Sequence, residues 1–462
     1  MAEGKKKAKE LTIEEKLKQA LVLESDQPYK IPKNWRRYRI SGLVTHLKRG
    51  KAPKYVEHSD IPVFAQKCNQ KNGTIDLEKA QFLNPELAGR IKEEEFLKDK
   101  DVLINSTGTG TLGRVGYYRS FYALPYCRVL PDSHITVIRG LDIVSQNYLY
   151  YYLKSKQEYL EQQGVGTTNQ KELRPEAIGN IIMPLPPLPE QQRIVDRIEG
   201  LFTKLDKAKE KAQAVVDGFE DRKAAILHKA CTGELTEEWR NNNQISTASW
   251  IQYKYGELGS SKLGKMLDKA KNTGKPVPYL RNINVRWFAF DLSDVFTMRA
   301  SEQEINSLKI QDGDLFICEG GEPGRCAIWR GTVDTDMIFQ KALHRFRPNE
   351  KVISEYLCYY LYYLSLSDSL EKFFTGTTIK HLTGKSLTEI PIKIPRIEEQ
   401  LKIIELLDRL FEKEQQAKES AEQVIAQIDT MKKSILARAF RGELGTNNPS
   451  DESAEELLKR IL

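Results

Sequence analysis

The stretch LPPLPEQQRIVDRIEGLFTKLDKAKEKAQ, residues 185–213, decides the fold because the chain contains it twice. The second copy is IPRIEEQLKIIELLDRLFEKEQQAKESAE, residues 394–422. The copies end in KAAILHKACTGELT and KSILARAFRGELG, and a constant offset of 209 residues aligns Gly233 with Gly442 without a gap. Such a register over about fifty residues indicates a duplicated unit.

Each copy is predicted to form one long helix. Apolar residues recur at alternating steps of four and three, which is typical of a coiled-coil seam. The first helix would cover residues 189–231, about 43 residues or roughly 64 Å. Two helices buried separately would not need the same heptad phase, so we expect the two to contact each other. The predicted contact residues are Leu201, Leu205, Val215, Phe219 and Arg222 in the first copy, and Leu410, Glu414, Val424, Ile428 and Ile435 in the second.

Length and composition bound the class of protein. A chain of 462 residues allows two or three domains, and its 40% hydrophobic and 29% charged residues are typical of a soluble globular protein. No apolar stretch is long enough for a membrane span, and the basic start MAEGKKKAKE lacks the apolar region of a secretory signal. We therefore expect a cytoplasmic protein without a membrane partner.

Cysteine spacing and net charge exclude fewer classes of protein than length and composition do. The six cysteines form no CxxC pair and no zinc-site spacing, so reduced thiols are expected. The net charge of +7 is compatible with nucleic acid, although many basic proteins bind nothing acidic.

A strand-rich domain precedes each long helix. Corresponding stretches include KDKDVLINSTGTGTLGRVGYY and IQDGDLFICEGGEPGRCAIWR, then NYLYYYL and EYLCYYL. A capping-box helix is predicted over residues 12–23, and EEWRNNNQISTAS is predicted to be a polar linker. The predicted divisions are residues 1–185 (helix and first domain), 186–235 (first long helix), 236–393 (linker and second domain), 394–445 (second long helix) and 446–462 (a tail with a short helix).

The order of domain, LPEQQ helix ending in TGELT, second domain, and IEEQ helix ending in FRGELG resembles the specificity subunits of type I restriction-modification systems. The resemblance covers essentially the whole chain. It implies an α+β fold in which two long antiparallel helices separate two target recognition domains, with an internal pseudo-two-fold repeat. It also implies a chain without catalysis of its own, which binds double-stranded DNA at a bipartite target.

The partners that the resemblance implies are two adenine-methylating subunits and, in a complex that also cuts DNA, restriction subunits. S-adenosylmethionine, ATP and Mg²⁺ would be bound by those partners and not by this chain. Related domains on a pseudo-two-fold frame predict two unequal half-sites about one helical turn apart, roughly 34 Å.

Arg222 and Glu414 interrupt the two apolar seams and predict the register of the antiparallel pair. The numbers of facing residues have a constant sum in such a pair, and facing Arg222 with Glu414 fixes that sum at 636. Val215 then lies opposite Ala421, a large residue against a small one, as interdigitating cores prefer. The alternative is that each charged side chain reaches solvent separately.

The glycine-rich motifs do not support a nucleotide site. Gly108, Gly110 and Gly113 have GxGxxG spacing, but a dinucleotide-binding turn opens a helix. The residues that follow are β-branched and aromatic, so we predict a strand-turn-strand hairpin here and in the matching EGGEPGR. The TGKS at residues 383–386 has Ile379 where a phosphate-binding loop needs glycine.

No catalytic or metal-binding residue is predicted. The chain lacks the acidic or amide residue followed by Pro-Pro and an aromatic residue with which adenine methyltransferases hold a flipped base. Its six histidines form no ligand pair. The alternatives are a self-sufficient DNA-modifying enzyme with an unrecognised active site and a coiled-coil scaffold that does not bind DNA. Missing motifs argue against the enzyme, and two domains with diverged loops argue against the scaffold.

Candidate DNA contacts lie in three pairs of loops. Amide and basic side chains are the types that read base edges and bind phosphates, although the same residues are common in ordinary turns. The tyrosines at residues 148–152 and 359–363 are predicted to be core. The candidates are Lys67, Asn69, Lys71, Asn72, Arg114, Thr168 and Asn169 in the first domain, and Arg281, Asn282, Asn284, Arg286, Arg325, Thr378 and Lys380 in the second.

Overall fold

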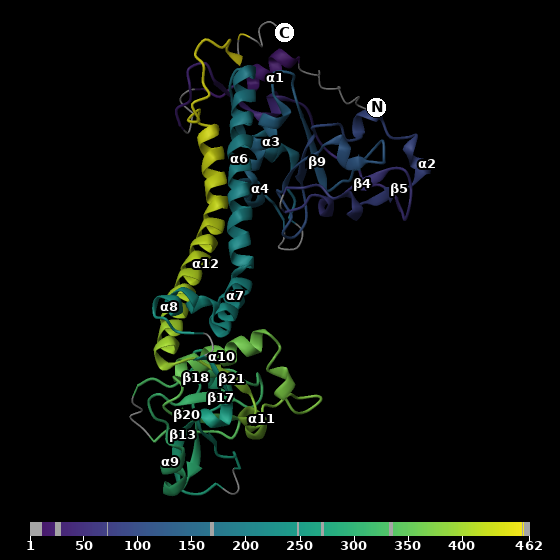
Figure 1. Ribbon diagram of the computed structural model, residues 1–462. Helices are drawn as coiled ribbons and strands as arrows, with labels where there is room; N and C mark the ends of the chain where they lie inside the picture. Colours follow the sequence, from purple (N-terminus) through teal and green to yellow (C-terminus); the bar gives the residue numbers. More distant parts are fainter. Residues whose placement is uncertain are drawn as a thin grey trace. The chain divides into compact units, whose positions relative to one another are not determined.

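The computed structural model describes residues 12–23, 29–71, 73–166, 171–246, 249–268, 272–331, 336–454 and 456 (Figure 1). The chain divides into two compact units, which we call unit 1 (Met1–Glu210 with Val424–Leu462) and unit 2 (Lys211–Gln423). Each unit therefore combines one strand-rich domain with the adjoining halves of both long helices, whereas the sequence division placed its boundaries at the helix ends. Among the described helices, none is long and apolar enough to cross a membrane.

The two long helices have different continuity. The second is a single helix, α12 (Ile397–Ala439), of 43 residues. The first is interrupted at Gly218 and forms α6 (Leu188–Asp217) and α7 (Phe219–Thr232), so the prediction of one unbroken helix is wrong. The Arg222 guanidinium lies close to the backbone at this point, where residue 218 is glycine. A Cβ on Gly218 would lie 2.7 Å from Arg222 Nη1.

The helices are antiparallel in each unit, with the predicted register. In unit 2, Arg222 Nε donates to Glu414 Oε2 at 2.7 Å. In unit 1, Lys432 Nζ lies 2.5 Å from Asp206 Oδ1 and 5.1 Å from the centre of the Phe202 ring. In each of these pairs the two residue numbers add up to 636 or to a number that differs from it by two, and 636 is the sum that the predicted register requires. The Arg222–Glu414 pairing is confirmed, and the alternative of two separately solvated charges is wrong.

The predicted seam residues are not all buried. Phe219 and Ile428 are 6% and 1% exposed, but Val424 is 43% exposed. Along α12 the buried face at this level passes from Ala421 through the half-buried Ile425 to Ile428, which leaves Val424 at the edge. The prediction of Val424 as an interface residue is therefore wrong. The remaining predicted contacts are at least half-buried, namely Leu201, Leu205, Val215, Leu410 and Ile435.

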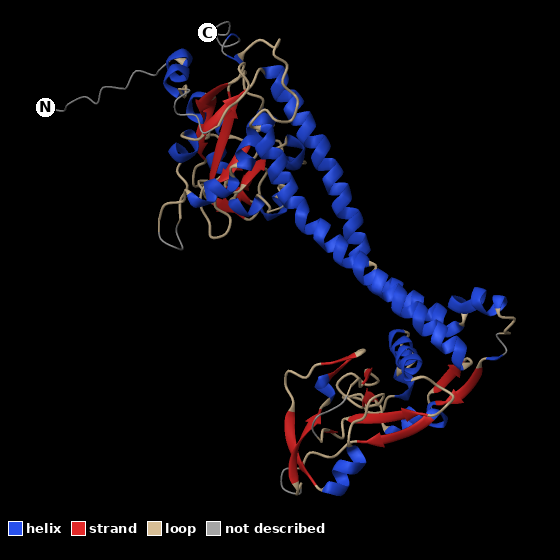
Figure 2. Ribbon diagram, turned by 90° about the vertical axis from the view of Figure 1, so that its left-hand side faces the viewer, coloured by secondary structure: helices blue, strands red, loops and turns tan. Residues whose placement is uncertain are grey.

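Unit 1 contains two four-stranded sheets, ordered β2-β9-β6-β7 and β3-β5-β4-β8, and the pair β1-β10. Figure 2 shows these sheets in red against the blue helices. The strands are β1 (Arg36–Arg39), β2 (Val44–Arg49), β3 (Tyr55–Val56), β4 (Pro62–Phe64), β5 (Gln81–Leu83), β6 (Val102–Asn105), β7 (Val115–Tyr117), β8 (Leu130–Pro131), β9 (Ile135–Gly140) and β10 (Ile182–Leu185). The helices besides α6 and α12 are α1 (Ile13–Ala20), α2 (Pro85–Ala88), α3 (Gln146–Ser155), α4 (Gln157–Gln162) and α5 (Pro175–Gly179).

Unit 2 repeats this plan with the sheet β12-β20-β17-β18, the smaller sheet β16-β13-β19, and the pairs β11-β21 and β14-β15. The strands are β11 (Ile251–Lys254), β12 (Gly259–Leu263), β13 (Lys275–Leu280), β14 (Val285–Arg286), β15 (Ala289–Phe290), β16 (Phe296–Ala300), β17 (Leu315–Cys318), β18 (Cys326–Ile328), β19 (Ile338–Phe339), β20 (Leu343–Pro348) and β21 (Pro391–Ile394). The helices are α8 (Glu237–Asn242), α9 (Glu302–Leu308), α10 (Ser354–Leu366) and α11 (Gly384–Thr388). The mixed, strand-rich domains predicted from the sequence are confirmed.

Equivalent buried contacts show that the two domains share one framework. Arg139 Nε donates to Asp101 Oδ1 at 2.7 Å, and Arg347 Nε donates to Asp314 Oδ1 at 2.6 Å. Tyr148, in the predicted tyrosine core, is 0% exposed. The capping box predicted near the N-terminus is present, with reciprocal hydrogen bonds between Thr12 and Glu15.

The Glu-Gln pair that begins each long helix joins it to its domain. Gln191 Nε2 donates to Ile143 O at 2.9 Å, and its Oε1 accepts from Ser145 N at 2.8 Å. Gln400 makes the same two kinds of contact with residues 351 and 353. Both glutamines are fully buried, so each satisfies backbone groups that would otherwise lack partners.

The glutamate of each pair binds a tryptophan that lies just before the domain's first strand. Trp35 Nε1 donates to Glu190 Oε2 at 2.8 Å, and Trp250 Nε1 donates to Glu399 Oε2 at 3.0 Å. Glu399 also accepts from Arg240 Nη1 at 2.6 Å. Arg240 lies in α8, so the segment predicted to be only a linker contains a helix that holds this buried charge pair.

Candidate nucleic-acid interface

Three loops that are distant in sequence meet in unit 1. We call residues 66–71, 105–114 and 171–173 loop cluster 1. Asn105 Nδ2 donates to Gln66 O at 3.1 Å, which joins the first two loops. Leu173 N donates to Ser106 O at 2.8 Å, which joins the third. The predicted glycine-rich hairpin is confirmed, because β6 and β7 are antiparallel on either side of it.

The equivalent three loops meet in unit 2, and we call residues 281–286, 318–325 and 375–382 loop cluster 2. Asn282 Nδ2 donates to Gly320 O at 3.2 Å, and Leu382 N donates to Glu319 O at 2.7 Å. The EGGEPGR turn also joins two antiparallel strands, β17 and β18. The structure therefore brings together the three predicted loops in unit 2, and in unit 1 it joins the first two loops to residues 171–173, which follow the third predicted stretch.

The two hairpin arginines hold these clusters together. Arg114 Nη1 donates to Asn69 O at 2.5 Å, and Arg325 Nη2 donates to Asn282 O at 3.0 Å. Arg325 also forms an ion pair with Glu322 at 2.7 Å. Each guanidinium thus binds the neighbouring loop of its own domain, and a phosphate contact by Arg114 or Arg325 stays a prediction.

Two of the predicted base contacts are buried inside the fold. Asn69 is 0% exposed, and its Nδ2 donates to Asn105 Oδ1 at 3.0 Å. Asn284 is 1% exposed, and its Nδ2 donates to Asp291 O at 2.9 Å. Because both side chains are buried, neither amide reaches a base edge, and both predictions are wrong. Asparagine was ambiguous in the sequence because it serves turns as readily as bases.

Arg281 is also engaged within its domain. Its Nη2 lies 2.7 Å from Asp294 Oδ2, and its guanidinium stacks on Phe296 at 4.0 Å from the ring centre. The side chain is largely buried, so a role in base contact is not supported. Asn282 is half-buried and hydrogen-bonded to the hairpin.

The candidates that remain exposed are Lys67, Lys71, Arg286, Thr378 and Lys380, while Asn72, Thr168 and Asn169 lie outside the described residues.

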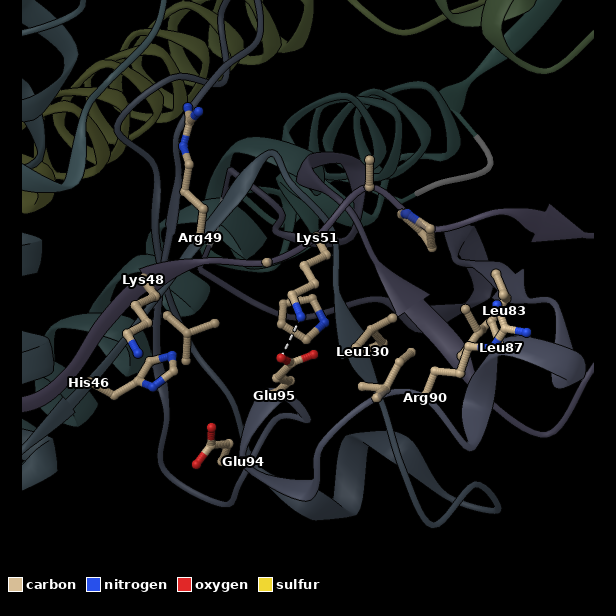
Figure 3. A pocket seen from close by; sticks show the side chains of 16 residues that line it. His46, Lys48, Arg49, Lys51, Leu83, Leu87, Arg90, Glu94, Glu95 and Leu130 are labelled. Atoms are coloured by element: carbon tan, nitrogen blue, oxygen red, sulfur yellow. Dashed lines mark hydrogen bonds and ion pairs between the residues drawn. The ribbon is translucent and has the colours of Figure 1, made fainter. Parts of the chain in front are cut away.

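A pocket of about 310 Å³ lies next to loop cluster 1 and is lined by residues from both sheets of unit 1 (Figure 3). Its apolar side includes Leu83 and Leu130, and its charged edge carries Lys51, which lies 2.5 Å from Glu95 Oε1. Arg49 connects the pocket to the cluster, because its Nη2 donates to Ser106 O at 3.2 Å. These residues carry no motif that sequence reasoning would recognise.

The histidine of this pocket is neutral at physiological pH. Burial, together with the nearby positive charges of Arg139 and Lys48, lowers the pKa of His46 to about 4. The pocket therefore presents a neutral imidazole beside cationic side chains.

The chain matches the family described as "Type I restriction modification DNA specificity domain" over residues 32–215 and 248–425. Among curated relatives, it is 24% identical to the type I restriction enzyme EcoKI specificity subunit of Escherichia coli strain K12, over 94% of this chain and 96% of that protein. It is 25% identical to the EcoBI specificity subunit of Escherichia coli, over 82% of this chain and 88% of that protein.

Solved structures have the same fold. The HsdS subunit from Thermoanaerobacter tengcongensis is similar with a TM-score of 0.64 and 18% sequence identity, over 91% of this chain and 100% of that one. A chain from a study of complex assembly and conformational transition of the type I R-M system has a TM-score of 0.56, 19% identity and coverage of 90% and 100%. The chain therefore belongs to the type I restriction-modification DNA specificity family and is a specificity subunit that carries the family's domain twice.

Proposed function

We propose that this subunit recognises a DNA target made of two unequal half-sites separated by an unread spacer, with one half-site for each loop cluster. The observation that carries the proposal is the duplication of the loop arrangement. The framework contacts of the two units are equivalent, but the exposed residues of the clusters differ: the first loop exposes Lys67 and Lys71 in unit 1, and Ile283 and Arg286 in unit 2. A common framework with different loops suits two modules that read different sequences.

The exposed side chains supply the chemistry that this function needs. Lysine and arginine bind phosphates and set the position of a protein on DNA, whereas base edges supply sequence information. Lys67 and Lys71 in cluster 1, and Arg286 and Lys380 in cluster 2, are exposed and cationic. Arg286 lies 3.5 Å from Asp291 and Lys380 lies 2.7 Å from Glu371, so DNA phosphates would compete with these exposed carboxylates. Arg286 and Thr378 can also reach base edges, since arginine binds guanine and threonine binds several bases.

In this proposal the chain performs no chemistry itself. Two methyltransferase subunits would transfer the methyl group to adenine N6, with S-adenosylmethionine bound on those subunits. Restriction subunits, where the system has them, would bind ATP and Mg²⁺. This division follows from the absence of a recognisable catalytic motif in the sequence and from the names of the relatives, which are specificity subunits.

The direct test compares methylation of plasmid DNA by the purified chain with S-adenosylmethionine, alone and together with its methyltransferase partner. We expect methylation only when the partner is present. Methylation by the chain alone would establish the self-sufficient enzyme instead. If the complex methylated DNA without sequence preference, the chain would be a scaffold rather than a reader.

A further inference from the structure

A basic groove continues from loop cluster 1 to the second long helix within unit 1. Its first part, of about 470 Å³, is lined by residues of the glycine-rich hairpin, including Arg114, with Lys71, Gln157, Glu161 and Lys171. Its second part, of about 600 Å³, shares Lys71 and Gln157 with the first and continues between α3, α4 and α12. The two hollows therefore adjoin at Lys71 and Gln157.

The second part has an excess of positive charge. Two acidic residues line it, Glu158 and Asp429, against six cationic side chains. The cationic residues are Lys71, Lys154, Lys156, Lys432, Lys433 and Arg441.

Only some of these charges are neutralised by the protein. Lys433 forms an ion pair with Glu158, and Lys432 lies 2.5 Å from Asp206. Lys154 Nζ instead donates to the neutral oxygen of Gln157, Oε1, at 2.9 Å. Lys156 lies over the Tyr152 ring at 5.7 Å from its centre, and neither Lys154 nor Lys156 has a carboxylate partner among the described residues.

Burial makes these two charges costly without an anion. Burial lowers the pKa of both Lys154 and Lys156, because removal from water disfavours the ammonium form. An anion in the groove would restore the favourable environment that water supplied. The walls also carry aromatic rings, including Tyr152 and Phe440.

The second unit does not repeat this charge pattern. Tyr148 and Tyr356 are equivalent, since each hydroxyl donates to a carbonyl of the strand before a long helix, at 2.8 Å. By this alignment Lys154 corresponds to Tyr362 and Lys156 to Leu364. The positive charge is therefore not required by the shared framework, which folds with an aromatic and an aliphatic residue at the same positions.

We propose that this groove binds the phosphate backbone of DNA beyond the bases that loop cluster 1 contacts, so that unit 1 supplies an additional, sequence-independent anchor. The inference rests on the proposed function, because the DNA enters the groove from cluster 1. Unit 2 has Tyr362 and Leu364 in place of Lys154 and Lys156. The two half-sites therefore contribute unequally to affinity, with the larger salt-dependent part supplied by unit 1.

The test measures DNA affinity against KCl concentration for the complex with its methyltransferase partner. Duplexes carry the methylated target or a scrambled sequence. The variant is Lys154→Gln with Lys156→Gln. The slope of log K against log[KCl] should become shallower by about two, because each lost phosphate contact removes roughly 0.9. Specific and scrambled DNA should lose affinity by the same factor.

Two control variants make the result specific. Lys204→Gln with Lys207→Gln removes the same charge from α6 outside the groove and should leave the slope near wild type. Lys154→Arg with Lys156→Arg retains the charge and should keep the wild-type slope. If the Gln variant folds and assembles but retains the wild-type slope, the groove does not bind DNA. Loss of the methyltransferase from the variant complex, with an unchanged slope in intact complexes, would assign the groove to the partner protein.

The same experiment separates this inference from the proposed function. A wild-type complex that fails to distinguish target from scrambled DNA would contradict the proposed function itself. A wild-type complex that distinguishes them, together with a groove variant of unchanged slope, would contradict only the groove.

Discussion

At the residue scale, two buried glutamates connect the helices to the domains in chemically different ways. Glu190 accepts from Trp35 and from Asn447 Nδ2 at 2.8 Å, which are neutral donors. Glu399 accepts from Trp250 and also pairs with Arg240, whose side chain is only 4% exposed. Loss of one charge therefore has different consequences in the two units, although the motif is the same.

We expect Glu399→Gln to lower the free energy of unfolding by about 3–5 kcal/mol, because it leaves the buried Arg240 charge unpaired. The matched variant Glu190→Gln should cost about 1–3 kcal/mol, since its partners are neutral. Urea unfolding of both variants measures the difference. Equal losses would show that the Arg240 charge is not held by Glu399 in solution.

His46 gives a prediction about pH. Its folded pKa of about 4 is below the unfolded value, so between pH 6.5 and 4 the unfolded chain binds more protons. Stability is therefore lost as pH falls through this window. His46→Asn should lose less stability than wild type between pH 7 and 5. Because the ring is only partly buried, the difference should stay below about 1 kcal/mol. Parallel stability curves for the two proteins would refute the depressed pKa.

At the element scale, the break in the first long helix and the ion pair between the helices both involve the side chain of Arg222. Arg222 donates through Nη2 to Val215 O at 2.8 Å and through Nε to Glu414, and its guanidinium lies against Gly218. The Val215 carbonyl is thus bound by a side chain from the other side of the break. The equivalent positions of α12 are Gln427 and Met431, and α12 continues without interruption.

A double-mutant cycle tests the ion pair. Arg222→Met and Glu414→Leu should be coupled by about 1 kcal/mol, and the double variant should recover part of the lost stability. The value is well below that of a fully buried pair because the two side chains are 37% and 22% exposed. Additive losses in urea unfolding would mean that the two charges do not interact.

Gly218→Ala tests the role of the glycine. Alanine favours a helix interior over glycine by about 1 kcal/mol, so helix propensity alone predicts stabilisation. We expect no such gain, and a smaller Arg222–Glu414 coupling, because the new Cβ would displace the guanidinium. Full stabilisation with unchanged coupling would contradict the contact between Arg222 and Gly218.

At the scale of the whole molecule, the features that recur along the sequence can be predicted from it, whereas features that depend on one or two residues cannot. The 209-residue offset and the seam period predicted the two domains, the long helices and their register, because each recurs over many residues. The helix break at Gly218 involves only that glycine and the guanidinium of Arg222, so it produces no periodic pattern in the sequence. The burial of Asn69 and Asn284 cannot be predicted from the sequence, because buried turn asparagines and base-reading asparagines have the same sequence environment. Comparison of Lys154 with Tyr362 between the copies would have indicated the charged groove.

The long helices give a prediction about the spacer. Inserting one heptad into a helix adds about 10.5 Å, roughly three base pairs of DNA, while preserving the seam. We expect the recognised spacer to lengthen accordingly. Inserting four residues instead also changes the rotation and should impair binding. An unchanged spacer after heptad insertion, seen by sequencing methylated DNA, would exclude the helices as its ruler.

The central claim is that each loop cluster reads its own half-site, and sequencing of N6-methyladenine in cells that express the complex tests it most directly. We expect one target of two unequal half-sites with an unread spacer. Exchanging the exposed residues of cluster 2, including Arg286, Thr378 and Lys380, for those of a relative should change one half-site and leave the other intact. A single continuous target, or a change in both half-sites, would contradict the claim.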